Sequence, residues 1–360
     1  MPEPEKTPNK PPFIRPPLSK TPLASAPKRR KRSIFRTLLW VFFTLMVVRI
    51  FFLVSFFIPS SSMENNLMVG DFVLVSKTAY GIRLPMSIPI PFTQRTIPNI
   101  EFPYIRLFSK PVQRGDVVVF NYPGNQHPID TNTSYIKRAV GLPGDEVEIE
   151  DKVLLVNGHH YPLGNGMKQA WLIQLTDANM VIPEPILSAR NLLIGARVSP
   201  KELWVHGSTV DVQYLKSLPY VVSVEPYVRR DFVDHVFPKG APWSLDVYGP
   251  LKVPKSGETI PINAQTWAAY HSVILQFEGN ASAVWKDNRF LLDGKPQQNY
   301  TFRKNYYFML GDNRDDSVDS RIWGFVPEDH LVGKALMVYF STHPQTMVPR
   351  FDRMLKSIGS

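Results

Sequence analysis

Two side chains of this sequence could together carry out nucleophilic catalysis without a histidine or a cysteine. Ser62 is the last serine of a Pro-Ser-Ser-Ser-Met run that begins at Pro59, and Lys137 lies in a Tyr-Ile-Lys-Arg-Ala-Val run. A serine hydroxyl is a weak nucleophile until a neighbouring base removes its proton. A buried lysine that is neutral at working pH can be that base. The two residues therefore form a candidate Ser-Lys pair that can attack a carbonyl.

The residues around Lys137 predict a buried strand. Alternate side chains of a strand share a face, so Tyr135, Lys137 and Ala139 should point the same way. Because its neighbours are largely apolar, the amine should be desolvated, which lowers its pKa. A lysine that snorkels at a strand edge is the alternative. The polar loop over residues 311–321 favours a buried Lys137.

A dense polar loop spans residues 311–321, directly after an aromatic run that ends at Leu310. Its acids do not follow the spacing of a calcium-binding EF-hand, because the twelfth position counted from Asp312 is Trp323 instead of a glutamate. The arginines of the loop instead favour internal ion pairs with its aspartates. The adjacent His159 and His160 would point to opposite faces of a strand. We therefore predict no metal site and no cofactor.

The elements that must position these residues begin with a hydrophobic segment. Residues 37–58 are mostly Leu, Val, Phe and Ile and as a helix would reach ~33 Å, enough for a bilayer core of ~30 Å. We predict a transmembrane helix over residues 33–58. A cleaved secretory signal and a buried helix of a soluble domain are the alternatives. The length of the run and the lack of an Ala-x-Ala cleavage site favour a retained anchor.

Basic residues are concentrated before this segment. The net charge is +10, and residues 28–32 read Lys-Arg-Arg-Lys-Arg. Such a cluster beside an apolar run sets membrane orientation more often than it binds nucleic acid. We therefore expect a disordered, Pro-rich cytoplasmic tail over residues 1–32, a chain outside the cytoplasm after Ile58, and no nucleic-acid partner. The chain has no cysteine, which excludes disulfides.

The rest of the chain has the pattern of a β protein. Short apolar runs bounded by Gly, Asp or Asn recur at residues 72–75, 117–120, 153–156 and 306–310. We predict a mainly β fold: a membrane-anchored catalytic core over 59–145 and 301–342, an inserted second domain over 146–300, and a tail over 343–360. Both a short amphipathic helix and a frayed end fit the tail. Residues 84–108 are rich in proline, so they predict a loop, either on the membrane or on the sheet.

Together these segments resemble the conserved boxes of bacterial type I signal peptidase. The resemblance covers about residues 37–81, 114–156 and 300–340. It implies a membrane-bound serine endopeptidase that removes the signal peptides of exported preproteins after small residues. The partners implied are those signal peptides and the lipid bilayer. The location implied is the bacterial inner membrane, with a single span and the catalytic domain on the periplasmic side.

The resemblance also implies a role for each matching residue. Ser62 would be the nucleophile and Lys137 the general base. Ser317 would orient the lysine amine, while Ser60 Oγ and the Ser62 backbone N–H would form the oxyanion hole. The residues that would support the site by ion pairing are Asp319, Arg321, Asp312 and Arg138. The residues that would line shallow pockets for small substrate side chains are Ile58, Met63, Leu67, Tyr135 and Ile136.

One departure from the family pattern lies next to the nucleophile. The family commonly has Pro-Thr two residues after the methionine, whereas this chain has Glu64, Asn65 and Asn66 before Leu67. We expect asparagine side chains to close this turn instead. Two other functions stay open: a self-cleaving repressor-type Ser-Lys protease, and an inactive anchored β-scaffold. The membrane helix argues against the first, and the presence of both members of the pair argues against the second.

Overall fold

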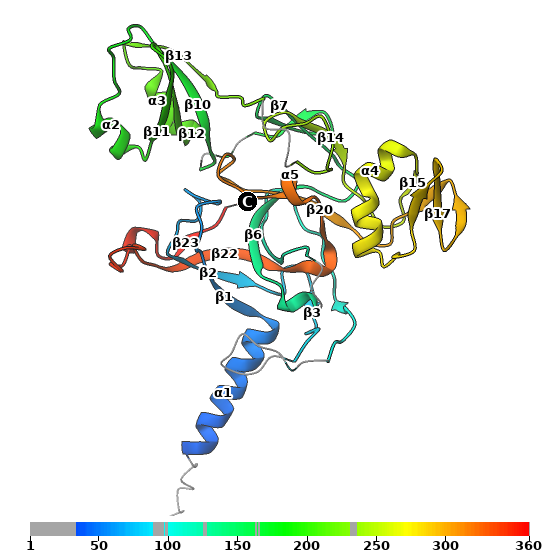
Figure 1. Cartoon of the computed structure of the whole chain (residues 1–360). Coiled ribbons are helices and arrows are strands. Elements are labelled where there is room, and N and C mark those ends of the chain that lie inside the picture. The colour runs from blue at the N-terminus through cyan, green and yellow to red at the C-terminus, as the bar shows by residue number, and fades with distance from the viewer. Residues whose placement is uncertain are drawn as a thin grey trace, which may run out of the picture. The chain divides into compact units, whose positions relative to one another are not determined.

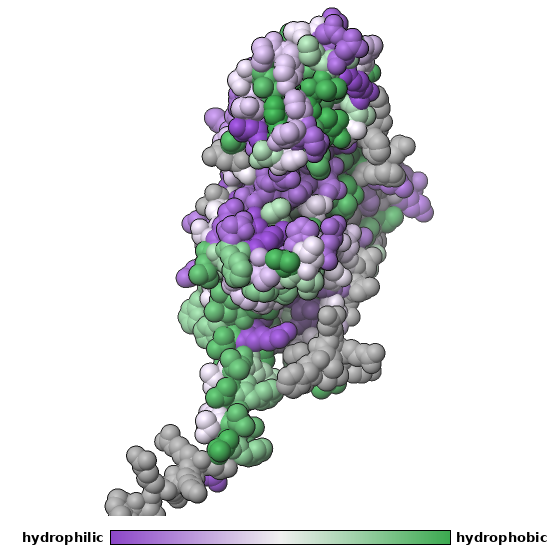
Figure 2. Space-filling model, turned by 90° about the vertical axis from the view of Figure 1, so that its left-hand side faces the viewer, coloured by the Kyte–Doolittle hydropathy of each residue, from purple (hydrophilic) through white to green (hydrophobic). Residues whose placement is uncertain are grey.

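The first element of the computed structural model is an apolar helix. The structure describes residues 34–88, 97, 100–124, 128–162, 164, 166–230 and 236–359, so the predicted tail over 1–32 lies outside the described residues. Helix α1, Ile34–Phe51, has no buried residue and a mean hydropathy of 1.9 over its 18 residues. Hydrophobic side chains cover the face of α1 seen in Figure 2. Its length and composition are those of a membrane span of ~27 Å.

The predicted helix end at Ile58 was wrong. The helix ends at Phe51, and the next residues form strand β1, Leu53–Phe57, which pairs antiparallel with β2, Asp71–Ser76. The side chains of β1 alternate between exposed and half-buried, which is the two-residue period of a strand. Leu, Val and Phe suit a strand as well as a membrane helix, so pairing with β2 decides the conformation.

A seven-strand path forms the centre of the protein, and it confirms the mainly β prediction (Figure 1). The strand order is β1-β2-β22-β5-β6-β20-β21, with β23 paired to β22. The bounds of the further strands are β5 Val117–Asn121, β6 Ser134–Gly141, β20 Tyr306–Leu310, β21 Val326–Pro327, β22 Leu331–Ser341 and β23 Lys356–Ser357. Val117 and Val119 pack into one hydrophobic cluster, and Val118 and Phe120 pack into another. Both faces of the sheet are therefore buried along β5.

Residues 146–300 contribute to two hydrophobic cores. One core belongs to a four-stranded sheet of order β11-β12-β10-β13 with two short helices. Its elements are β10 Lys168–Leu175, α2 Glu184–Ala189, β11 Leu193–Ser199, β12 Glu202–Ser208, α3 Thr209–Leu215 and β13 Val221–Pro226. The other core joins Val147 and Tyr248 to Phe308 of the central sheet. The boundaries predicted for an inserted domain at 146 and 300 stay a prediction.

The second core is built from small elements. A sheet of order β14-β7-β8-β9 consists of β7 Glu146–Glu150, β8 Val153–Val156, β9 His159–His160 and β14 Tyr248–Lys252. Helix α4, Ala264–Ser272, continues into a π-helical turn η2, Val273–Phe277. The remaining strands are β15 Thr259–Pro261, β16 Val284–Lys286, β17 Arg289–Leu292, β18 Lys295–Gln297 and β19 Asn299–Thr301.

The Pro-rich stretch is closed by a two-residue strand pair. Strand β3, Ile82–Arg83, pairs with β4, Arg106–Leu107. Arg83 is buried, and its Nη1 donates to Asn121 Oδ1 at 2.9 Å, which ties the stretch to β5. Residues 84–108 were predicted to form neither a regular helix nor a central strand, and the described residues of this stretch agree with that prediction. Residues 89–96, 98 and 99 lie outside it, and contact with a membrane stays a prediction.

The C-terminal tail folds onto the central sheet. Instead of an amphipathic helix or a frayed end, it forms the 3-10 turn η4, Phe351–Arg353, and strand β23. Arg353 donates to both carboxylate oxygens of Asp71, at 3.1 Å and 2.6 Å, and Arg350 Nη2 lies 3.2 Å from Oδ1. Burial alone would raise the pKa of Asp71, but the hydrogen bonds from Arg353, the Met68 N–H and Ser341, together with the charge of Arg353, outweigh burial, so that the pKa lies below its ordinary value.

We expect Arg353→Ala to reduce the free energy of unfolding by about 2–3 kcal/mol, because it removes two charge-assisted bonds from a buried carboxylate that keeps Arg350 as a partner. Denaturant unfolding of the full chain in detergent, followed by tryptophan fluorescence, measures the loss. Lys356→Ala, an exposed change in the same tail, is the control. Equal losses in both variants would contradict the tail's role.

The same ion pair gives a pH dependence with a defined sign. A carboxyl whose folded pKa is depressed stabilises the protein above its unfolded pKa, here 3.8, and the contribution disappears as the pH falls below that value. The difference in stability between the wild type and Arg353→Ala should therefore be constant near neutrality and shrink below about pH 4. Unfolding curves recorded from pH 7 to pH 3 test this. A difference that grew towards acid would contradict it.

Candidate active site

Ser62 and Lys137 lie in hydrogen-bond contact. Lys137 Nζ is 2.7 Å from Ser62 Oγ, and the two residues are 3% and 9% exposed. Ser62 belongs to the turn between β1 and β2, while Lys137 lies in the middle of β6. The structure therefore brings together the two residues that the sequence singled out, from segments 75 residues apart.

Pairing of β6 with its neighbouring strands fixes the backbone at and next to Lys137. Lys137 pairs with Val118 of β5, and the following residue, Arg138, pairs with Leu310 of β20. Lys137 Nζ also donates to the carbonyl oxygen of Ile136 at 3.0 Å. Because the Lys137 side chain is almost fully buried, these two contacts hold the amine beside Ser62.

Burial lowers the pKa of Lys137 to about 8. Desolvation of the ammonium is the largest cause, and the nearby carboxylates of Asp319 and Asp312 act in the opposite direction. A pKa near 8 leaves a substantial neutral fraction at slightly alkaline pH. A neutral amine 2.7 Å from a hydroxyl can accept its proton.

The polar loop after β20 holds the turn that carries Ser62. The backbone N–H of Asn313 donates to the Ser62 carbonyl at 3.1 Å, and its Nδ2 donates to the Ser61 carbonyl at 3.1 Å. Ser61 Oγ donates to the Asp316 carboxylate. Sequence reasoning assigned no role to Asn313, although an asparagine inside a polar loop beside the site was a signal for such a bond.

Arg138 and Asp312 form a buried bidentate pair. Both N–H···O contacts are 2.7 Å, and Arg138 Nη1 also donates to the Gly115 carbonyl at 2.6 Å. Asn66 Nδ2 donates to Asp312 Oδ2 at 2.6 Å. An asparagine side chain had been expected to close the turn after the nucleophile. The side chain of Asn66 instead joins this turn to the polar loop.

Asp319 and Arg321 form the second buried pair, with two contacts of 2.8 Å. Asp319 Oδ2 also accepts from the Gly311 backbone N–H at 3.1 Å, and Arg321 Nη2 donates to the Arg314 carbonyl at 2.7 Å. A Cβ at Gly311 would lie 2.6 Å from the Ser62 carbonyl oxygen, so only glycine lets the loop approach the nucleophile this closely.

The two other predicted site serines differ from each other. Ser60 Oγ is exposed and lies 3.4 Å from Ser62 Oγ. Ser317 is buried, and its Oγ has no hydrogen-bond partner among the described residues. The predicted bond from Ser317 to the lysine amine is therefore not made in this conformation. Ser62 Oγ and the Ile136 carbonyl hold the amine instead.

The predicted pocket residues divide into core and surface. Ile58 is 2% exposed, and Met63 and Leu67 are fully buried in the same hydrophobic cluster. The turn packs these apolar side chains against β2 and β5, and their role in lining shallow substrate pockets stays a prediction. Tyr135 and Ile136 are half-buried and do present surface beside Lys137.

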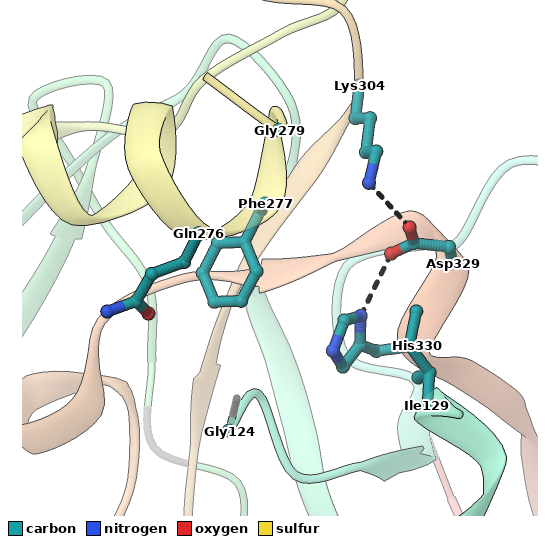
Figure 3. A pocket seen from close by; sticks show the side chains of 8 residues that line it. All are labelled: Gly124, Ile129, Gln276, Phe277, Gly279, Lys304, Asp329 and His330. Atoms are coloured by element: carbon teal, nitrogen blue, oxygen red, sulfur yellow. Dashed lines mark hydrogen bonds and ion pairs between the residues drawn. The ribbon is translucent and has the colours of Figure 1, made fainter. Parts of the chain in front are cut away.

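A separate cavity of about 380 Å³ is lined by neither member of the pair (Figure 3). Asp329 at its edge accepts from Lys304 Nζ at 2.7 Å and from His330 Nδ1 at 2.9 Å. Burial would raise the pKa of Asp329, but His330 and Lys304 lower it to about 2. These charged groups satisfy one another, which favours a structural role. The full lining is Gly124, Ile129, Gln276, Phe277, Gly279, Lys304, Asp329 and His330.

Comparison with known proteins places the site in a family. The model of the family described as signal peptidase, peptidase S26, matches residues 31–213 and 256–340. The signal peptidase I of Buchnera aphidicola subsp. Acyrthosiphon pisum is 30% identical over 301 residues, which cover 84% of this chain and 72% of the relative. The signal peptidase I of Pseudomonas aeruginosa is 28% identical over 327 residues, covering 87% and 75%.

A solved signal peptidase I from Enterococcus faecalis V583 is 18% identical and covers 62% of this chain and 97% of its own, with a TM-score of 0.24. At that score the superposition carries no argument. The matches of the family model and of the curated relatives cover most of the sequence. The chain therefore belongs to the signal peptidase family, peptidase S26, and is a serine peptidase of the signal peptidase I type.

Proposed function

We propose that this enzyme cleaves the signal peptides of exported preproteins after small residues, with Ser62 as nucleophile and Lys137 as general base. The observation that carries the proposal is the 2.7 Å contact between Ser62 Oγ and a buried lysine amine. Signal-peptide cleavage is the activity of the family. The assignment of the chemistry to these two residues rests on the geometry, the burial and the lowered pKa of Lys137.

The chemistry follows from one proton that moves twice. Neutral Lys137 takes the proton of Ser62 Oγ as that oxygen attacks the scissile carbonyl carbon, and then gives it to the leaving amine. Ser60 Oγ and the Ser62 backbone N–H would stabilise the oxyanion of the tetrahedral intermediate. Water, deprotonated by the same amine, then hydrolyses the acyl ester and restores Ser62. These residues need no cofactor for any step.

The substrate would bind by adding a strand to β6. Strand β5 pairs with residues 134–138 of β6, whereas β20 pairs with Arg138, Ala139 and Gly141 only. Among the described residues, the first half of β6 therefore has one edge free for main-chain hydrogen bonds to an extended peptide. Such a peptide would pass Tyr135 and Ile136 and reach Ser62. Small substrate side chains would suit the little space left beside these half-buried residues.

The enzyme would be anchored in the inner membrane by α1 with its N-terminus in the cytoplasm. Residues 28–32 are all basic and precede an apolar helix, which is the pattern that keeps the N-terminus inside. The catalytic residues would then face the periplasm, where exported preproteins emerge. The family assignment argues against the repressor-type alternative, and the Ser62–Lys137 contact argues against the scaffold alternative.

Ser62→Ala and Lys137→Met should each lower kcat for a model preprotein by about 10⁴-fold or more, because a nucleophile and its base act as one unit. Methionine keeps the buried volume of the lysine but cannot accept a proton. Cleavage by the detergent-solubilised enzyme, followed on gels, measures the loss. The matched controls are Ser217→Ala and Lys216→Ala, both exposed. Near-normal activity in Lys137→Met would refute the mechanism.

The pH dependence of kcat/KM should follow the ionisation of Lys137. Because the neutral amine is the working form, kcat/KM should rise about tenfold per pH unit below pH 8 and level off above the lowered pKa of Lys137. Initial rates from pH 6 to pH 10 test this. A plateau that began near pH 6, or a rise that continued to pH 10, would show that another group controls the rate.

The orientation can be tested by protease accessibility. In spheroplasts, an external protease should digest residues after Pro59 and leave residues 1–32 intact, since the basic residues retain the N-terminus inside. Tags placed at the two ends and detected after digestion provide the measurement, with detergent-lysed cells as the control. Protection of both tags in intact spheroplasts would contradict a single N-inside span.

A further inference from the structure

The first residue of strand β10 contacts the loop that holds the nucleophile (Figure 1). The backbone N–H of Lys168 donates to the Asp312 carbonyl at 2.8 Å, and the N–H of Arg314 donates to the Lys168 carbonyl at 2.9 Å. Two residues further along β10, the N–H of Ala170 donates to Asp315 Oδ2 at 2.6 Å. The sheet β11-β12-β10-β13 is therefore joined directly to the loop whose Asn313 holds Ser62.

The side chain of Lys168 points into the same region and is fully buried. Its Nζ lies 3.6 Å from Glu64 Oε1 and 3.5 Å from the carbonyl oxygen of Asn191. Glu64 follows the nucleophile by two residues, and its side chain is 22% exposed. A buried ammonium requires a counter-charge, so this pair draws the turn after Ser62 towards β10.

The next two residues of the turn contact the same part of the chain. Asn65 has a positive φ of 78°, and its Oδ1 accepts from Asn191 Nδ2 at 3.3 Å. A Cβ at Gly166 would lie 2.6 Å from Asn66 Oδ1, so the residues before β10 pack closely on Asn66. Three consecutive residues after the nucleophile thus lie against the segment from Gly166 to Asn191. Asn65 and Asn66 are the positions at which the chain departs from the Pro-Thr pattern.

We infer that Lys168 is a positioning residue for the nucleophile. Its ion pair with Glu64, anchored by the pairing of β10 with the 312–314 loop, holds the turn so that Ser62 Oγ stays within reach of the Lys137 amine. The inference rests on the proposed roles of Ser62 and Lys137. It gives the β10–β13 sheet a part in catalysis that needs no contact with the substrate.

A positioning role differs from a purely structural one in what it changes. Lys168 touches neither the reacting atoms nor the free edge of β6, so loss of the pair should misalign the nucleophile without weakening substrate binding. The midpoint of the pH profile should stay near 8, because Lys137 remains buried. A purely structural pair would instead affect activity only in proportion to the loss of folded protein.

Two variants of the full-length enzyme separate these roles. Glu64→Gln leaves the buried Lys168 charge unpaired, so it should lower both the melting temperature and kcat, the latter by about 10- to 100-fold, with KM within twofold. Adding Lys168→Met removes the unpaired charge and should return the melting temperature close to that of the wild type. Because the pair is still absent, kcat should stay about 10- to 100-fold low.

Glu258→Gln is the matched control, since it breaks the ion pair between Glu258 and Lys252, whose side chains are 22% and 48% exposed, and should leave kcat unchanged. Recovery of kcat together with the melting temperature in the double variant would overturn the inference, as would normal kcat in Glu64→Gln. Ser62→Ala and Lys137→Met are assayed in parallel. If these two stay active the proposed dyad fails, whereas if they are inactive and Glu64→Gln is normal, only the positioning role fails.

Discussion

Burial of the Lys137 amine in the central sheet is the constraint on which the rest of the site depends. Desolvation lowers the pKa of this lysine to about 8 although two carboxylates close to it act in the opposite direction. Those carboxylates, Asp312 and Asp319, are each occupied by an arginine through two hydrogen bonds. A free carboxylate at either place would favour the charged lysine and remove the base. The two buried ion pairs therefore give each carboxylate a counter-charge and also hold the loop.

One loop connects the whole site. It supplies both aspartates, the asparagine that binds the Ser61 and Ser62 carbonyls, and a glycine that allows the close approach. The same loop also pairs with the first residue of β10. Backbone hydrogen bonds therefore connect the sheet β11-β12-β10-β13 to the loop that binds the Ser62 carbonyl. Positions outside the sequence motifs of the family, such as Lys168, can on this account affect turnover through Ser62.

The sequence predicted what depends on local pattern and residue chemistry. The mainly β fold followed from short apolar runs bounded by Gly, Asp or Asn, and the pairing of Ser62 with Lys137 followed from a serine after an apolar run and a lysine among apolar residues. It could not predict what depends on distant partners. Leu, Val and Phe at residues 53–57 suit a helix or a strand, and only β2 makes them a strand.

The other differences also have distant causes. The tail is ordered because Arg353 reaches Asp71, and Met63 is core because the turn folds onto β2. The mechanism depends on the lowered pKa of Lys137, and ¹⁵N NMR of lysine side chains measures that pKa, with Lys137→Met to assign the Nζ signal. We expect the Lys137 signal to titrate with a midpoint near pH 8. A midpoint near the ordinary value of 10.5 would contradict it.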